Sequence, residues 1–203
     1  HHHLNWNLEG YYDLSSIWVS KKGIKSKKDL IWVDLNILPN QGRAIGGHII
    51  SISGEIPKGF QSSCNPNILA GITATEFHRK FSFSTLIYLL WLHNIEIKPN
   101  LLARLLVLHS DASWLKFQNY TENCKKWQKI LTDYKWQLLF QDVNTKMFEK
   151  QIDVELYPFL QKIDAVSDKS KLKSTHLNIH SKQYQCNPDW DEDVILQLFN
   201  LFG

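Results

Sequence analysis

The chain has 203 residues, of which 43% are hydrophobic, 12% are aromatic and 21% are charged. This composition is typical of a folded globular protein, and it excludes the disordered, collagenous and low-complexity classes. The formal net charge of +3 is too small to indicate nucleic-acid or membrane binding by itself.

The cysteines and the chain start add expectations about compartment and processing. Cys64, Cys124 and Cys186 are widely spaced, and an odd count without a close pair argues against a disulfide scaffold. We therefore expect an intracellular protein in a reducing compartment. No apolar run reaches ~18 residues, so no transmembrane segment is expected. The three opening histidines, residues 1–3, are interpreted as the remnant of a purification tag.

The first sixty residues are predicted to form strands. Three short runs, residues 11–19, 30–38 and 48–56, are rich in β-branched and aromatic side chains and are separated by turn residues. The simplest arrangement is an N-terminal antiparallel sheet of three strands.

A helical region is predicted after the loop at residues 57–67. Thr73 and Glu76 have the spacing of a capping box, so a helix is expected to begin near Ala74 and to run toward His93. The serines and threonine at residues 82–85 are poor helix formers and favour a break within it.

Two more helices are predicted in the middle of the chain. Residues 101–108 are apolar on nearly every side, which indicates a central buried helix. A further helix is expected to open at residues 121–123, because Trp127, Ile130 and Tyr134 follow at helical spacing.

The last third is predicted to hold a late β-hairpin, a linker and a helix. Residues 136–143 and 151–157 are expected to pair about a turn at 144–146, since apolar residues alternate with acids after Gln151. Residues 164–187 are Lys-rich and polar, which is typical of a linker or loop. Residues 188–203 open with acids and continue with an apolar stripe, so they are predicted to form an amphipathic helix.

The predicted fold class is therefore α+β. It comprises an N-terminal antiparallel sheet, a helical middle, a late β-hairpin and a C-terminal amphipathic helix. Residues 4–163 are expected to form a single domain. The apolar stripe of the last helix is expected to dock on the body of the protein, on a partner protein, or on a second copy of the chain.

One cluster of residues suggests a specific chemistry. The run Gly46-Gly47-His48 is followed by Asn67 and then by the segment Glu76-Phe77-His78-Arg79-Lys80. Over residues 43–80 this order resembles the HNH nuclease family, whose small ββα module binds one divalent metal ion. The resemblance implies that His48 is the catalytic general base, that Asn67 orders the loop, and that His78 is a metal ligand.

The chemistry of phosphodiester hydrolysis agrees with these residue types. A neutral imidazole with a pKa near ~6.5 accepts a proton from water at neutral pH. A divalent metal ion stabilises the charge that develops on the phosphate. Arg79 and Lys80, next to the expected ligand, are candidates for phosphate contacts. The alternative is that His48 is an ordinary strand residue and His78 an exposed helix residue.

Two other patterns point to metals. Residues 69–76 resemble the opening of the homing-endonuclease motif named for its Leu-Ala-Gly start, in which Glu76 would bind metal. His176, His180 and Cys186 have zinc-like spacing if they are helical, although a polar surface loop is the alternative.

Basic runs are the remaining functional signal. One covers residues 21–28, and the other, at residues 169–182, holds four lysines and no acid. Such lysines bind the phosphates of nucleic acid or anionic headgroups, or they only solubilise a turn. The nucleic-acid-binding candidates in the second run are Lys169, Lys171, Lys173 and Lys182.

Two functions of different class follow from these patterns. The first is a nucleic-acid-acting protein, in the form of an HNH-like phosphodiester hydrolase that depends on a divalent metal ion. The second is a non-enzymatic interaction or structural protein of viral or mobile-element type. Such a protein would bind protein, nucleic acid or a membrane surface.

Overall fold

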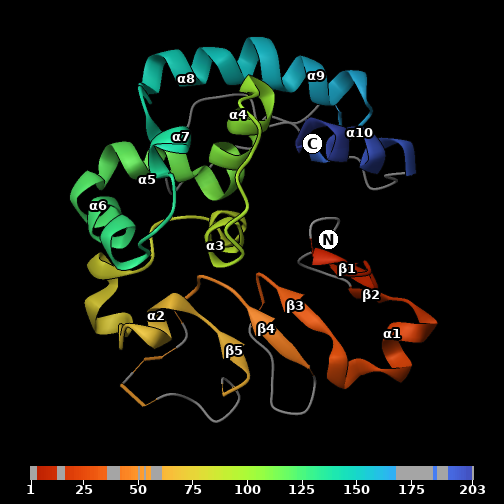
Figure 1. Cartoon of the computed structure of the whole chain (residues 1–203), viewed down its shortest axis with the longest axis vertical. Coiled ribbons are helices and arrows are strands. Elements are labelled where there is room, and N and C mark those ends of the chain that lie inside the picture. Colours follow the sequence, from red (N-terminus) through yellow and green to blue (C-terminus); the bar gives the residue numbers. More distant parts are fainter. Residues whose placement is uncertain are drawn as a thin grey trace. The chain divides into compact units, whose positions relative to one another are not determined.

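The computed structural model confirms a mixed α+β protein (Figure 1). It describes residues 4–12, 17–35, 42–49, 51–52, 54–55, 61–167, 185–186 and 192–202. The chain divides into two compact units, His1–Phe81 and Ser82–Gly203. The single domain expected over residues 4–163 stays a prediction.

The first unit begins with a β-hairpin and a short basic helix. Strands β1 (Gly10–Tyr12) and β2 (Ile17–Val19) pair antiparallel, with Tyr11 opposite Trp18. Helix α1 (Lys21–Lys25) follows at once, and the Ser20 side chain caps it by accepting from the backbone N–H of Gly23. The 3₁₀ turn η2 (Lys27–Asp29) then leads into the second sheet.

The second sheet is parallel, not antiparallel as predicted. It contains β3 (Ile31–Val33), β4 (Arg43–Ile45) and β5 (Ser63–Cys64) in that order. The run at 11–19 folds back as its own hairpin. In the run at 48–56, the described residues form no strand.

A glycine fixes the entry to β4. Gly42 has a φ of +115°, and a Cβ there would lie 2.6 Å from the Leu30 carbonyl oxygen. The neighbouring Arg43 N–H donates to that same carbonyl at 2.8 Å. Only glycine combines this backbone conformation with so close an approach.

The expected capping box after the sheet is absent. Helix α2 (Pro66–Leu69) is followed by the 3₁₀ segment η4 (Ala74–Arg79), which does begin at Ala74. Thr73 makes no side-chain cap, because its hydroxyl bonds that of Thr75 at 2.7 Å. Glu76 pairs with Arg79 instead of reaching back.

The second unit is mainly helical. Helix α4 (Leu101–His109) confirms the predicted buried helix, with Leu105, Val107 and Leu108 fully buried. Helix α6 (Thr121–Ile130) confirms the helix expected from residue 121. The other helical elements in the first part of the unit are α3 (Thr85–Leu92), η5 (Ser110–Ala112) and α5 (Ser113–Asn119).

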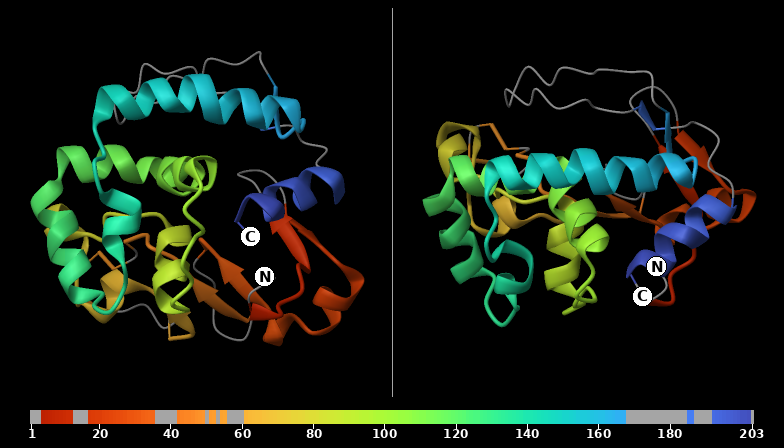
Figure 2. Two further views of the ribbon diagram at one scale, coloured as in Figure 1. Left: turned by 45° about the horizontal axis from the view of Figure 1, so that its top comes forward. Right: turned by 90° about the horizontal axis from the view of Figure 1, so that it is seen from above.

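The hairpin predicted about residues 144–146 is wrong. Residues 136–162 form α7 (Trp136–Phe140), α8 (Thr145–Gln151), the π-helical η6 (Ile152–Leu156) and α9 (Tyr157–Lys162). The Asn144 side chain accepts from the Met147 N–H, so Asn144 begins a helix. Ile152 and Leu156 are buried while Val154 is exposed, which is a spacing of four and not of two. In both views of Figure 2, α8, η6 and α9 form one continuous rod.

The end of the chain includes a short strand pair and a helix. Strands β6 (Val166–Ser167) and β7 (Gln185–Cys186) pair antiparallel. Helix α10 (Glu192–Phe202) confirms the predicted C-terminal helix over these residues. It contacts α4, and Val194 and Leu201 are buried, so part of its apolar stripe docks internally. Among the described residues, none of the helices has the length and hydropathy needed to cross a bilayer.

Candidate functional site

The candidate site lies at the carboxyl end of the parallel sheet. Asp34 directly follows β3, Gly46-Gly47-His48 follows β4, and Asn65 follows β5. The sheet hydrogen bonds continue past the strand ends: the Asp34 N–H donates to Ile45, and the Gly46 N–H donates to Cys64. The carboxyl edge of a parallel sheet is where open α/β folds bind their ligands.

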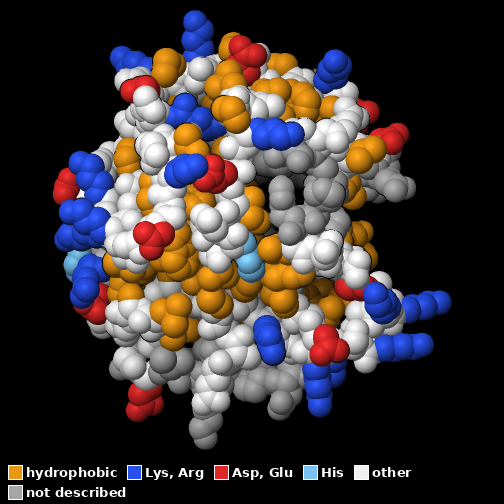
Figure 3. Space-filling model, in the orientation of Figure 1, with side chains coloured by type: hydrophobic (Ala, Val, Ile, Leu, Met, Phe, Trp, Pro, Cys, Tyr) orange, Lys and Arg blue, Asp and Glu red, His pale blue; other side chains and the backbone are white. Residues whose placement is uncertain are grey.

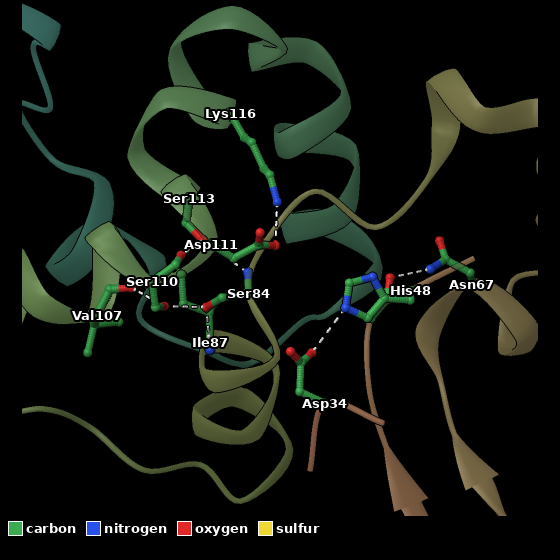
Figure 4. Close-up of polar contacts among 11 residues, drawn as sticks. Asp34, His48, Asn67, Ser84, Ile87, Val107, Ser110, Asp111, Ser113 and Lys116 are labelled. Carbon is green, nitrogen blue, oxygen red and sulfur yellow. Dashed lines mark hydrogen bonds and ion pairs between the residues drawn. The ribbon is translucent and has the colours of Figure 1, made fainter. Parts of the chain in front are cut away.

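A histidine and a carboxylate meet at this edge. His48 Nε2 lies 3.4 Å from Asp34 Oδ1 (Figure 4). Asp34 has a φ of +65°, a left-handed conformation that aspartate tolerates better than most residues. The side chains are 62% and 52% exposed, so the pair contributes at most about 1 kcal/mol to stability.

Two buried asparagines hold the backbone of His48. The Asn65 side-chain amide donates to the His48 carbonyl at 2.7 Å, and the Asn67 amide donates to the Gly47 carbonyl at 2.7 Å. Asn65 Oδ1 in turn accepts from the Asn67 N–H at 2.9 Å. Both asparagines are fully buried. A satisfied buried polar network of this kind fixes one loop geometry, because an unpaired buried amide is costly.

The same asparagine connects the histidine loop to the basic segment. Asn67 Oδ1 accepts from the Phe81 N–H at 2.6 Å, and the Ala74 N–H donates to the Ser51 carbonyl at 2.9 Å. These bonds attach both ends of η4 to the loop that carries His48. Arg79 and Lys80 are thus positioned by the same network as the histidine.

A tyrosine from the hairpin also approaches the edge. The Tyr12 hydroxyl donates to the Val33 carbonyl at 2.6 Å, one residue before Asp34. Burial, with a smaller contribution from the Asp34 charge, raises the pKa of Tyr12. The hydroxyl therefore stays protonated at neutral pH and keeps its role as a donor.

The structure brings together part of the predicted site. His48 and Asn67 share one network, η4 carries His78 and Arg79, and Lys80 follows η4 directly. Arg79 pairs with Glu76, and the Lys80 ammonium lies 4.3 Å from the Phe77 ring centre. The lysines of the second basic run lie outside the described residues, as do His176 and His180; they are Lys169, Lys171, Lys173 and Lys182.

The part of the chain that the structure describes contains no cluster of three or more potential ligands for the predicted divalent metal ion. No group of three or more His, Cys, Asp or Glu side chains gathers there as a metal site. His48, predicted as the general base, pairs with Asp34. The divalent metal ion stays a prediction.

Two residues of the site, Asp34 and Asn65, escape prediction from the sequence. The alternation of residues 30–38 places Asp34 in the interior of a strand, and only the parallel pairing of β3 with β4 brings it beside His48. Asn65 lies two residues before Asn67, and the signal that could have identified it is the Asn-Pro pair that begins a helix.

A second polar cluster lies within residues 82–203. Ser84 caps α3, its N–H donates to Ser113 Oγ at 2.9 Å, and Ser110 Oγ lies 2.7 Å from Ser84 Oγ (Figure 4). Asp111 and Ala112 both have left-handed backbones, and Lys116 pairs with Asp111. These contacts hold the corner between α4 and α5, which is a structural role.

Buried titratable groups surround that corner. His109 Nε2 lies 2.8 Å from the Tyr157 hydroxyl, and burial lowers the pKa of His109 to about 4. Burial raises the pKa of the Cys124 thiol to about 11, so this free cysteine stays protonated and unreactive. Both groups are neutral at pH 7, as their surroundings require.

Comparisons with protein-family models, with curated proteins and with solved structures find no match.

Proposed function

We propose that this protein acts on nucleic acid at the Asp34–His48 pair, with His48 as the general acid and base. The observation that carries the proposal is the 3.4 Å contact between His48 Nε2 and Asp34 Oδ1 at the carboxyl end of the parallel sheet. The contact is exposed to solvent and therefore accessible to a large substrate.

Each part of the site has a separate task in this proposal. Asp34 orients the imidazole and stabilises its protonated form once it has accepted a proton, as carboxylates do in other acid–base pairs. His48 removes the proton from the attacking hydroxyl or water and returns it to the leaving oxygen. Asn65 and Asn67 hold the backbone so that the ring stays on Asp34.

The cationic side chains favour a phosphate-containing substrate. Arg79 is more than half exposed although it pairs with Glu76, so a phosphate competes with that carboxylate at small cost. Lys80 lies over an exposed aromatic ring, Phe77, which is 57% exposed. A cation next to an exposed ring is a common pairing in proteins that bind single-stranded nucleic acid.

The proposal keeps part of the resemblance to the HNH nuclease family. His48 as base and Asn67 as the residue that orders the loop remain in the proposal, and the buried amide of Asn67 supports the second role. His78 as a metal ligand does not enter, because the described residues around it offer no ligand set.

A cleavage assay tests the proposal. Labelled single- and double-stranded DNA and RNA are incubated with the full chain, with and without Mg²⁺, and the products are separated on a gel. His48→Gln should lower the cleavage rate by about 10²- to 10⁴-fold, the usual contribution of a general acid–base group. His93→Gln, in the second unit, is the control for a histidine outside the site and should cleave like the wild type. Equal rates for all three proteins would refute the role of His48.

The second candidate is a nucleic-acid-binding protein without catalysis. It is favoured by the exposure of both side chains of the pair, since acid–base pairs in enzymes are usually shielded from water. In that case the wild type binds the labelled strands and leaves them intact.

A further inference from the structure

The β1–β2 hairpin presents an aromatic face to solvent. Tyr11 and Trp18 are opposite each other, and their rings stack with centroids 4.8 Å apart and planes 23° apart. Tyr11 is 59% exposed and Trp18 is 44% exposed. Tyr12, on the other face of the ribbon, is half-buried and bonded to Val33. The ribbon is therefore attached on one side and open on the side of the stacked rings.

A basic helix is fixed against the end of this ribbon. The Ser20 N–H donates to the Glu9 carbonyl at 2.7 Å, and Lys22 Nζ lies 3.2 Å from Glu9 Oε1. A Cβ on the buried Gly23 would lie 2.7 Å from a methyl of Val19, so α1 packs directly on β2. The exposed lysines of α1 and η2 thus have a defined place at the end of the ribbon; they are Lys21, Lys22, Lys25, Lys27 and Lys28.

The positive charge of the whole chain is concentrated in this unit. Residues 1–81 contain nine Lys and Arg against six Asp and Glu, which equals the net charge of +3 for all 203 residues. The segment at residues 21–29 contributes five lysines and one aspartate to this balance. Figure 3 shows basic side chains projecting from the surface over α1. The partner of this surface should therefore be anionic.

We propose that Tyr11, Trp18 and the lysines of residues 21–28 bind one single strand of nucleic acid. Unpaired bases stack on the exposed rings while the ammonium groups contact the backbone phosphates. The inference rests on the proposed function in one respect: it names a single strand as the form of nucleic acid that reaches the Asp34–His48 pair.

The geometry favours a single strand over a duplex. Bases in a duplex are already stacked and paired, so their faces are not available to aromatic side chains, whereas unpaired bases expose them. The position of the ribbon agrees with this assignment. Tyr12 follows Tyr11 in β1 and bonds the residue before Asp34, so the ribbon is attached to the strand that leads to the pair.

The test is fluorescence anisotropy of a labelled oligothymidylate titrated with the full chain. Trp18→Ala should weaken binding by roughly 5- to 100-fold, which corresponds to the loss of one stacked base. Trp18→Phe keeps a ring and should bind almost as well as the wild type. Ile17→Ala is the matched control, because Ile17 is exposed on the same strand but on the opposite face.

The salt dependence tests the lysines separately and leaves the hairpin unchanged. Replacing Lys25, Lys27 and Lys28 with Gln should reduce the slope of log affinity against log salt by about 0.7 for each phosphate that a lysine no longer neutralises. A thermal melt shows whether Trp18→Ala is folded. If it is not, the lysine variant still tests the proposal. An unchanged slope would overturn the role of these lysines.

Two results would overturn the proposal as a whole. One is a Trp18→Ala protein that binds the oligonucleotide as tightly as the wild type. The other is binding of the wild type to vesicles containing phosphatidylserine but not to the oligonucleotide. Binding and cleavage fail independently: if His48→Gln cleaves normally while Trp18→Ala loses binding, the proposed function fails and the single-strand surface remains.

Discussion

The two units of this chain differ in how much apolar side chain they bury. Among the described residues of the first unit, the fully buried apolar side chains are few, and the buried polar residues Ser51, Asn65 and Asn67 shape one loop. The second unit buries large rings such as Trp114 and Trp127, and its titratable His109 is held neutral. The comparison indicates that the apolar burial that stabilises the protein lies mainly in residues 82–203, while the proposed ligand-binding groups belong to residues 1–81.

The largest expected effect is on the core of the second unit. Trp127→Ala should destabilise the protein by about 3–5 kcal/mol, because it removes a fully buried ring from α6 and leaves a cavity. Trp18→Ala, on the open face of the hairpin, should cost less than about 1 kcal/mol. Urea denaturation followed by circular dichroism measures both. Equal destabilisation by the two changes would contradict the view that the second unit holds most of the stabilising burial.

The buried asparagines provide the next test. Asn67→Asp replaces the amide donor with a carboxylate that faces the Gly47 carbonyl oxygen, so it should cost about 1–3 kcal/mol. Asn119→Asp, at an exposed position at the end of α5, should be nearly neutral. The readout is again urea denaturation, combined with the NMR signals of the His48 ring. A stable Asn67→Asp protein with unchanged His48 signals would contradict the positioning role.

The third prediction concerns acid. His109 has a pKa of about 4 in the folded protein, below the ~6.5 of an unfolded chain, so the unfolded state binds its proton first. The contribution of His109 to the free energy of unfolding is therefore fully present above pH ~6.5 and is lost as the pH falls toward 4. Between pH 7.5 and 5 this loss amounts to about 2 kcal/mol. His109→Gln should remove that part of the pH dependence. If wild type and variant lose stability in parallel, another group is responsible.

The smallest effect on stability is expected at the candidate site itself. Asp34→Asn and His48→Gln should each change the unfolding free energy by less than about 1 kcal/mol, because the pair is exposed. A double-mutant cycle measures their coupling, which should be of similar size or smaller. A coupling of several kcal/mol would mean that the pair is part of the fold and not of a functional site.

Sequence patterns predict those elements whose signal is long and unambiguous. The apolar run at 101–108 predicts α4, and Trp127 at helical spacing predicts α6. Three-residue strands carry too little pattern to reveal parallel pairing, so the prediction for the second sheet is wrong. Apolar residues at positions 152, 154 and 156 wrongly indicate a strand. Ile152 and Leu156 are four residues apart, so the same pattern also fits one face of a helix.

The candidate site is predictable only in part, for a related reason. His48 and Asn67 follow from the order of residues along one segment. Asp34 reaches His48 only through the hydrogen bonds between β3 and β4, which no local pattern encodes. Asn65 is recognisable as important only once its amide is seen on the His48 carbonyl.

The most direct test of the central claim is a histidine-ring NMR spectrum of the full chain, recorded with and without a short single-stranded oligonucleotide. His48→Gln and His109→Gln assign the two signals among the nine histidines. The His48 signal should shift on addition of the strand, while the His109 signal stays in place. A shift at His109 with none at His48 would contradict the account.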